Sequence, residues 1–369
     1  MSSPVSLLSP AQLRRDLAIR DLSDPAQGPH AIQVLVGRAV DSLARAWNCD
    51  VRWCRGMRIV PVADNYDRLG YPSGAISRDA RYTRYVDPAR MLRSQASAMV
   101  PPALRRLAAE PADDVLLVCP GIVYRRDAID WQHTGTPHQL DLWRITRRAM
   151  SDADLDEMVT VLRGALLPGL AARQQPRTHP YTLRGRQVDA LRDGRWVEVW
   201  ECGLAHPGVL AAAGLRGHAG LALGMGLDRL LMLAKDIPDI RLLRSRDPRV
   251  ARQMLGLEGY RRVSVMPAIT RDLSVAVGAD EDEETLGDRI REALGADASR
   301  VEEARVLAAT DCGLLPESAI ARLGALPGQR NLLVRVVLRD LDTTLTNESA
   351  NILRDRIYRA LHQGTRYEM

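Results

Sequence analysis

Apolar residues spaced three and four positions apart predict a helix within the first 50 residues, a region that reads as helical. The apolar face of this helix consists of Ile32, Val36, Ala39, Val40, Leu43 and Ala44. The same spacing predicts another helix from about Asp152 to Ala172. Residues 61–88, which are rich in Gly, Pro, Tyr and Arg, are predicted to form an irregular loop.

Alternating apolar and polar positions between residues 113 and 200 predict several short strands. Two of these strands, 186–191 and 195–200, flank Arg192-Asp193-Gly194, and an Asp-Gly pair between two strands is a hairpin signal. We therefore expect an antiparallel sheet. An apolar strand at 221–226 then leads through two glycines into a helix that carries Arg229, with a glycine spacing that matches neither a dinucleotide fingerprint nor a P-loop.

The pattern changes after residue 246, which predicts a second domain. A connector is followed by a strand at 263–277, a helix at 282–295, strands at 301–310 and 331–340, a helix at 347–363 and a short tail. This β-α-β-β-α-β order is typical of the ferredoxin-like arrangement. We therefore expect an α+β protein with a first domain over 1–250, a linker over 251–265 and a ferredoxin-like domain over 266–369.

Composition excludes several classes of protein. The 369 residues are 46% hydrophobic and 26% charged, which is typical of one large or two smaller globular cores. No apolar run is long enough to span a membrane and no secretory signal is present, so we expect a soluble, cytoplasmic protein. Five scattered cysteines indicate neither a disulfide framework nor a zinc site. The net charge of +5 permits a polyanionic partner without requiring one.

The densest polar cluster lies between residues 124 and 141. If 122–126 and 138–143 are paired strands, Arg125 and Asp127 share a face, as do Gln139 and Asp141. One face would then hold a cation suited to phosphate beside acceptors suited to an ammonium group. A solvated hairpin with ordinary surface charges is the alternative. Arg229 either pairs within the core or points from its helix into a cleft.

These motifs together resemble class II aminoacyl-tRNA synthetases of the phenylalanyl type. The segment 121–127 with 138–141 resembles motif 2 of that family, and 223–229 resembles motif 3. Residues 266–272 through 345–348 are similar to the ferredoxin-fold anticodon-binding domain of single-chain, organelle-type members. The resemblance implies a class II antiparallel sheet flanked by helices over 1–250, with a helical part at 1–50, followed by the anticodon-binding domain.

The resemblance also implies roles for individual residues. Arg125 would contact the ATP α-phosphate, Asp127 the adenine amino group and Arg229 the γ-phosphate. Glu198 would help to hold Mg²⁺. Gln139 and Asp141 would bind the ammonium group of the amino acid. The residues expected around the substrate amino acid are Ser97, Gln139, Asp141, His179, Tyr181, Trp200, Glu201 and Ala222.

The amino-acid pocket departs from the family pattern. His179 and Tyr181 stand where the family has two phenylalanines that hold the substrate ring, and Trp200 and Glu201 replace small residues, whereas Ala222 is retained. An imidazole, a phenol, a carboxylate and an indole predict a preference for a hydrogen-bonding side chain, because buried polar groups left unpaired cost about 1–3 kcal/mol each. The alternative is that these changes accompany the removal of phenylalanine from the whole chain, which contains none.

The expected function is therefore ATP-dependent ligation of phenylalanine, or a polar aromatic analogue, to tRNA through an aminoacyl-adenylate. The cofactors would be ATP and Mg²⁺, and the C-terminal domain would bind tRNA through arginines on a sheet face. One alternative is an adenylate-forming paralogue that transfers the amino acid to a small molecule or carrier protein. Another is an inactive RNA-binding paralogue. We expect a monomer or a homodimer, in which the helix near residues 32–44 would pair with a second copy.

Overall fold

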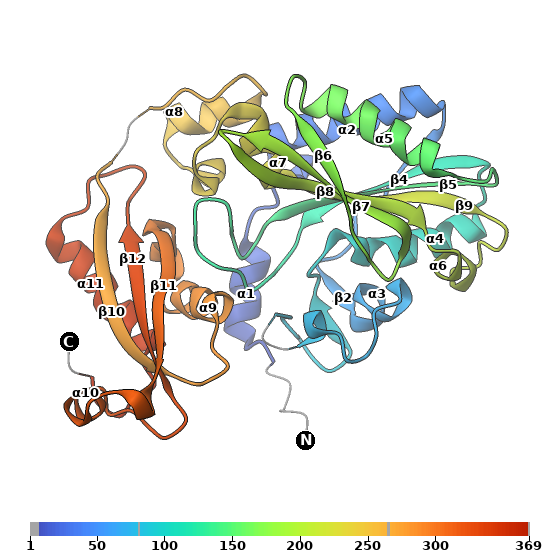
Figure 1. The fold of residues 1–369 in the computed structure, drawn as a ribbon. Helices are drawn as coiled ribbons and strands as arrows, with labels where there is room; N and C mark the ends of the chain where they lie inside the picture. The colour runs from blue at the N-terminus through green and yellow to red at the C-terminus, as the bar shows by residue number, and fades with distance from the viewer. Residues whose placement is uncertain (1–6, 80–81, 264–265, 368–369) are drawn as a thin grey trace. The chain divides into compact units, whose positions relative to one another are not determined.

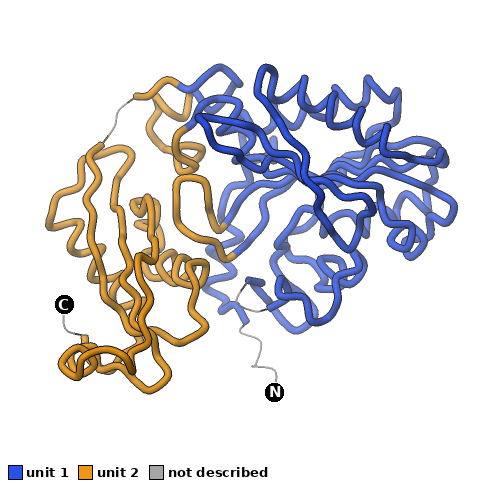
Figure 2. The backbone as a smooth tube through the Cα atoms, viewed as in Figure 1, with its two compact units in different colours: residues 1–125, 136–237, 253–260 blue, residues 126–135, 238–252, 261–369 orange. Residues whose placement is uncertain are grey.

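The computed structural model describes residues 7–79, 82–263 and 266–367, and the chain within them forms two compact units (Figure 2). Unit 1 comprises residues 1–125, 136–237 and 253–260, and unit 2 comprises 126–135, 238–252 and 261–369. The units are therefore not consecutive pieces of chain, in contrast to the predicted domains. Two segments from the first 252 residues, 126–135 and 238–252, group with the C-terminal part.

Unit 1 is built on a seven-stranded sheet with the order β1-β4-β5-β9-β8-β7-β6. Only β1 and β4 run parallel, so the expected antiparallel sheet is confirmed. The strands are β1 (Asp50–Trp53), β4 (Asp114–Ile122), β5 (His138–Thr146), β6 (Ala172–Pro176), β7 (Thr182–Arg192), β8 (Arg195–Ala205) and β9 (Ala219–Gly226). A small separate sheet pairs β2 (Ile59–Pro61) with β3 (Arg90–Leu92).

Helices cover the two faces of this sheet differently (Figure 1). One face carries α2 (Ala31–Trp47), α5 (Asp152–Leu166) and α7 (Leu227–Lys235). The other face carries α4 (Val100–Ala109) and α6 (Pro207–Ala212), whose apolar side chains share a core with Trp143 and Ala222. The remaining helices of unit 1 are α1 (Pro10–Ala18) and α3 (Val62–Asn65).

Several local predictions for unit 1 are confirmed, and others are wrong. The hairpin forms as expected, with Asp193 and Gly194 at φ 49° and 74° in the turn between β7 and β8. Helix α2 forms, and its predicted apolar face is buried within unit 1, so this face is not free to pair with a second copy. Helix α5 ends at Leu166 rather than Ala172, because residues 172–176 form strand β6.

Unit 2 contains a three-stranded antiparallel sheet with the order β10-β12-β11. Its strands are β10 (Ile269–Val277), β11 (Val301–Asp311) and β12 (Arg330–Leu338). Helices α9 (Glu283–Leu294) and α11 (Asn347–Leu361) pack on one face of this sheet around a shared apolar core. The short helices α8 (Pro248–Ala251) and α10 (Glu317–Leu323) complete the unit.

The fourth strand of a ferredoxin-like sheet does not form between Leu361 and Tyr367, so that part of the prediction is corrected. Residues after α11 contact the edge of β10 without forming a strand: the Gln363 amide donates to the Ala276 carbonyl at 2.8 Å, and His362 Nδ1 accepts from the Ala276 amide at 3.1 Å. The start of the predicted strand over 263–277 also shifts, because β10 begins at Ile269 and residues 264–265 lie outside the described residues. Among the described helices, none has the length and apolar character needed to cross a bilayer.

Candidate functional site

The register of the large sheet sorts side chains of β5, β8 and β9 onto two faces. Asp141 lies opposite Gly224, which lies opposite Glu201 on the next strand. Residues directly opposite each other in a sheet point to the same side, and alternate residues along a strand do so as well. Gln139, Asp141 and Trp143 therefore share this side, which we call the site face. The side covered by α2, α5 and α7 is the helix face.

Asp141 is the buried acidic residue at the centre of the site face, and it is 2% exposed. Its carboxylate accepts hydrogen bonds from the Ser97 hydroxyl and from Trp143 Nε1, the latter at 3.4 Å. Burial raises the pKa of Asp141 to about 6, although Ser97, Trp143, His179 and Arg125 all favour the charged form. A buried carboxylate with so few charged neighbours would gain strongly from a cationic group.

Gln139 and Ser97 are brought beside this carboxylate, as the sequence predicts. Gln139 Oε1 accepts from the Ala96 amide at 3.0 Å, which ties the turn before α4 to β5. The Ser97 hydroxyl bonds both Asp141 and Tyr181. Burial raises the pKa of Tyr181 well above its ordinary value, so its phenol stays protonated.

Aromatic rings surround Tyr181 on the site face. Its ring centroid lies 5.9 Å from that of Trp143, 5.3 Å from that of His179 and 6.2 Å from that of Tyr71. Burial raises the pKa of Tyr71 to about 12, and its hydroxyl donates to Gln95 Oε1 at 3.3 Å. Sequence reasoning missed Tyr71 and Trp143. The two-residue period from Asp141 was a signal for Trp143, whereas nothing in the sequence pattern placed Tyr71 here.

Glu201 forms the second acidic centre of the site face. His179 Nε2 lies 2.5 Å from Glu201 Oε2, and Arg177 Nε lies 2.6 Å from Oε1. Burial alone would raise the pKa of this carboxyl, but the hydrogen bonds and charges of His179 and Arg177 lower it overall. Glu201 is therefore a carboxylate held between two donors. Arg177 was not among the predicted site residues.

A β-bulge places Glu198 on the same face as Glu201. Asp189 pairs with Glu198, but its neighbour Val188 pairs with Trp200, so β8 carries an extra residue at this point. Residues three apart in a regular strand point to opposite faces, and the bulge removes this difference. Burial, followed by repulsion from Glu201, raises the pKa of Glu198.

The structure places Trp200 on the helix face, so its prediction as a pocket residue is wrong. Trp200 pairs with Met225, and Met225 pairs with Leu140, all of which face α2, α5 and α7. Trp200 is 1% exposed and acts as core. Strand alternation alone puts the adjacent Trp200 and Glu201 on opposite faces, so the expectation from the family resemblance that both line the pocket could not hold for both. Ala222 lies on the site face, opposite Trp143.

The two predicted phosphate-binding arginines both belong to unit 1. Arg125 follows the end of β4, and its Nε donates to the Ser94 carbonyl at 2.8 Å. Arg229 lies in the first turn of α7, where Nη1 is 3.4 Å from the Glu198 carbonyl. The strand pairing behind the motif 2 prediction is corrected, because β4 ends at Ile122. Asp127 belongs to unit 2, where its carbonyl accepts from Arg291.

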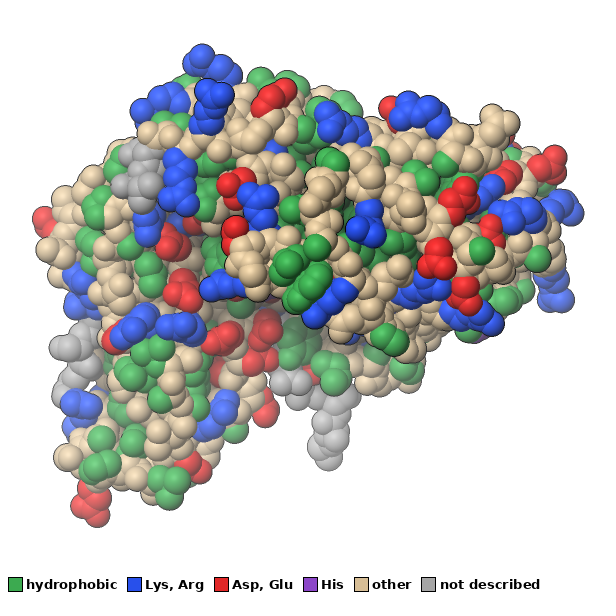
Figure 3. All heavy atoms as spheres, turned by 45° about the horizontal axis from the view of Figure 1, so that its top comes forward, with side chains coloured by type: hydrophobic (Ala, Val, Ile, Leu, Met, Phe, Trp, Pro, Cys, Tyr) green, Lys and Arg blue, Asp and Glu red, His purple; other side chains and the backbone are tan. Residues whose placement is uncertain are grey.

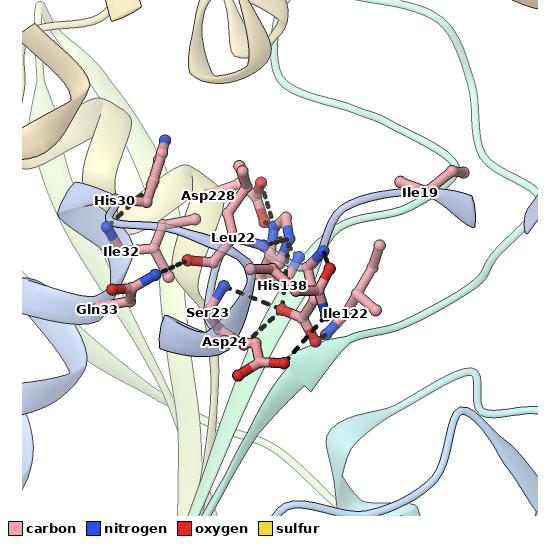
Figure 4. A network of polar contacts seen from close by, with 12 residues as sticks. Ile19, Leu22, Ser23, Asp24, His30, Ile32, Gln33, Ile122, His138 and Asp228 are labelled. Carbon is pink, nitrogen blue, oxygen red and sulfur yellow. Dashed lines mark hydrogen bonds and ion pairs between the residues drawn. The ribbon is translucent and has the colours of Figure 1, made fainter. Parts of the chain in front are cut away.

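A buried polar network fixes the start of α7 against β5 (Figure 4). His138 Nε2 accepts from the Leu22 amide at 3.0 Å, so the ring proton resides on Nδ1. His138 Nδ1 then donates to Asp228 at 3.0 Å. Because Asp228 precedes Arg229, the network holds the helix turn that carries this arginine. His138 is thus a structural residue of the motif.

A family model for the core domain of class II tRNA synthetases, labelled F, matches residues 38–254. This match covers more than half of the chain and contains the site face. The chain belongs to the class II tRNA synthetase core family. The match begins within α2 and ends before the sheet of unit 2, so the family assignment rests on the sheet of unit 1 and its helices.

The curated relatives that match this chain are phenylalanine–tRNA ligase alpha subunits. The phenylalanine–tRNA ligase alpha subunit of Histophilus somni is 28% identical over 247 residues, which is 66% of this chain and 72% of that protein. The alpha subunit of Nostoc punctiforme is 29% identical over 240 residues, 64% and 70% of the two chains. The alpha subunit of Actinobacillus pleuropneumoniae is 32% identical over 193 residues, 51% and 57%.

Class II synthetases use Mg²⁺ with ATP, and the Glu198 carboxylate on the site face fits such an ion. Burial and repulsion from Glu201 raise the pKa of Glu198, so a cation beside it would be stabilising, and Mg²⁺ is commonly bound by one or two carboxylates that are completed by substrate phosphates. No group of three or more candidate ligand side chains occurs within the described ranges.

Proposed function

We propose that the chain is an ATP-dependent aminoacyl-tRNA ligase that activates an α-amino acid as its adenylate. The observation that carries this proposal is the juxtaposition of Gln139, Asp141 and Ser97 on the site face of a class II core. A buried carboxylate and an amide beside each other suit an ammonium group. The positive charge of Arg125 favours the charged form of Asp141, so the guanidinium acts on this carboxylate electrostatically.

The chemistry requires charge neutralisation more than proton transfer. The amino-acid carboxylate would attack the α-phosphate of ATP, and pyrophosphate would leave. Such a reaction is accelerated chiefly by positioning and by stabilisation of negative charge. In this proposal Arg125 contacts the α-phosphate and Arg229 the γ-phosphate, with Glu198 holding Mg²⁺. The ion would neutralise phosphate charge. The two guanidinium groups would position the phosphates and stabilise the remaining negative charge.

Transfer to tRNA is supported by the family, whose curated relatives are named phenylalanine–tRNA ligase alpha subunits. The proposed acceptor is therefore the terminal ribose of a tRNA, with unit 2 as an anticodon-binding domain. The proposed amino acid from family resemblance is phenylalanine or a polar aromatic analogue. In this proposal a single chain carries both functions.

One observation favours a second candidate, an adenylate-forming enzyme with another acceptor. On the open face of the unit 2 sheet, where arginines are expected to bind tRNA, two of the described arginines lie beside acidic residues. Arg335 forms an ion pair with Asp272 at 2.7 Å, and Arg305 lies 3.9 Å from Glu303. These four residues sum to zero charge, which gives the face little attraction for a polyanion.

Two linked assays test the proposal on the full-length protein. ATP–pyrophosphate exchange with each of the twenty amino acids tests activation, and acylation of total tRNA then tests transfer. We expect both to proceed with the same amino acid. Exchange without any tRNA charging would contradict the ligase and favour the second candidate. Tight RNA binding without exchange would instead favour an inactive paralogue.

A further inference from the structure

On the site face, the side chain of a substrate held at Asp141 could extend in two directions, of which one is open and the other is closed. Two rows of side chains cross the strands here. The first row runs through Cys119, Asp141, Gly224 and Glu201, and the second row runs through Leu117, Trp143, Ala222 and Gly203. The rows are separated by two residues along each strand, about 7 Å. An amino acid held at Asp141 must extend its side chain along the first row or into the second.

Trp143 closes the second row. Its side chain is completely buried, lies opposite Ala222 and stacks on Tyr181 with an interplanar angle of 30°. The indole Nε1 also donates to Asp141, which fixes the ring against the carboxylate. At Gly203 a Cβ atom would lie 2.8 Å from Thr182 Cβ and 2.9 Å from the Leu183 carbonyl, so that end is filled as well.

Gly224 leaves space in the first row. A Cβ atom built there would meet only Asp141, with its nearest atom at 3.4 Å. On the far side of Gly224 stands Glu201 with its donors His179 and Arg177. The Asp141 and Glu201 backbones are two strand spacings apart, about 10 Å. Charged groups stand at both ends of this gap, and an apolar ring packed there would remove water from the Glu201 ion pairs without adding a hydrogen bond.

We propose that the substrate is an α-amino acid with a short, hydrogen-bonding side chain, held with its ammonium group at Asp141 and its side chain over Gly224 toward Glu201 and His179. Serine and threonine represent this class. The inference rests on the proposed function, because it takes Asp141 as the ammonium site. It departs from the aromatic substrate that family resemblance suggests, because the protein's own indole takes up the volume beside Ala222.

The test is ATP–pyrophosphate exchange by the full-length protein with serine, threonine, alanine, phenylalanine and tyrosine. We expect kcat/KM for serine or threonine to exceed that for phenylalanine by about 100-fold. Trp143→Ala should raise kcat/KM for phenylalanine relative to serine by about tenfold or more, because it opens the second row. The matched control is Trp196→Ala, which removes an exposed indole from β8 and should leave the ratio unchanged.

Glu201→Gln tests the side-chain end of the proposed substrate site separately from the ammonium end at Asp141. It should reduce the preference for serine over alanine by about tenfold while the exchange with alanine persists. Trp143→Leu, which leaves a smaller cavity, replaces Trp143→Ala if the latter does not fold. Efficient use of phenylalanine by the unaltered protein, or an unchanged phenylalanine-to-serine ratio in the folded Trp143 variant, would overturn the inference and leave the proposed function intact. Exchange with no amino acid at all would overturn both.

Discussion

At the scale of single residues, the protein contains one buried carboxyl group whose charged form is destabilised by burial and others whose charged form is stabilised by hydrogen-bond donors. Asp141 and Asp189 are both 2% exposed, yet their pKa values move in opposite directions. Burial dominates at Asp141. At Asp189 burial is outweighed by hydrogen bonds from Gln187, Arg173 and Gln175. A buried charge without enough donors is costly for folding and is typical of a position that binds an opposite charge.

Asp141→Asn should therefore stabilise the protein at neutral pH while it abolishes activation. The folded pKa of about 6 exceeds the ordinary value of 3.8, so the folded state binds the proton more tightly than the unfolded chain. The contribution of the Asp141 carboxyl to stability is therefore greatest below pH 4 and falls as pH rises through 6. At pH 8 the variant should gain up to about 3 kcal/mol. Urea unfolding of both proteins at pH 4 and pH 8 measures this difference.

Asp189→Asn is the matched control, with the opposite sign. Its folded pKa is lowered, so the contribution of Asp189 to stability is present above pH 4 and is lost as pH falls through the folded pKa. The variant should be less stable than the unaltered protein at pH 8. Equal unfolding free energies for Asp141→Asn and the unaltered protein at pH 8 would refute the burial argument at Asp141.

At the scale of elements, the fold positions the site through strand register and through the start of α7. His138 joins β5 to that helix by donating from Nδ1 to Asp228, which is 4% exposed. The network uses both ring nitrogens, because Nε2 accepts from Leu22. Loss of the ring would leave a buried carboxylate with fewer donors at the helix turn that carries Arg229.

His138→Leu should destabilise the protein by about 3–5 kcal/mol, since it removes one partner of a buried pair. It should also raise KM for ATP more than KM for the amino acid, because Arg229 belongs to the proposed nucleotide side of the site. His138→Asn is the control, because its amide can still donate to Asp228. Thermal unfolding and exchange kinetics measure both effects. Equal KM changes for the two substrates would argue against a role for this network in placing Arg229.

The elements also show how far the sequence could be interpreted. Periodicity correctly predicted α2, the β7–β8 hairpin and the strand-to-helix passage at 219–235, because each depends on local pattern and turn chemistry. Gln139 and Asp141 followed from strand alternation. Trp200 was placed wrongly because its assignment followed the family resemblance and not the alternation, which puts it on the face opposite to its neighbour Glu201. Tyr71 reaches the site by tertiary packing of a loop, which no local pattern encodes.

At the scale of the whole molecule, the excess positive charge is concentrated in one segment. Residues 241–262 contain seven of the 51 basic and two of the 46 acidic residues, which leaves 44 of each in the rest of the chain. The net charge of +5 therefore resides in this segment. Elsewhere on the surface drawn in Figure 3, side chains of both signs are intermixed. The segment is thus a better candidate for phosphate contacts than the charge-balanced face of the unit 2 sheet.

Replacing Arg246, Arg252 and Arg262 with glutamine should weaken tRNA binding in a salt-dependent manner. All three are exposed. The plot of log affinity against log salt concentration should become shallower by up to about 3 units. The control replaces the exposed Arg14, Arg163 and Arg195, which changes the net charge equally. Filter binding at several salt concentrations measures both variants, and equal losses in the two would assign the effect to overall charge.

The central claim is that the site face of this class II core binds an amino acid through Asp141 and couples it to ATP. The most direct test is pyrophosphate exchange measured side by side on the unaltered protein and on Asp141→Asn, with every amino acid in turn. The account predicts exchange with at least one amino acid and its loss by roughly 100-fold or more in the variant. Equal exchange by the two proteins, or none by the unaltered one, would contradict it.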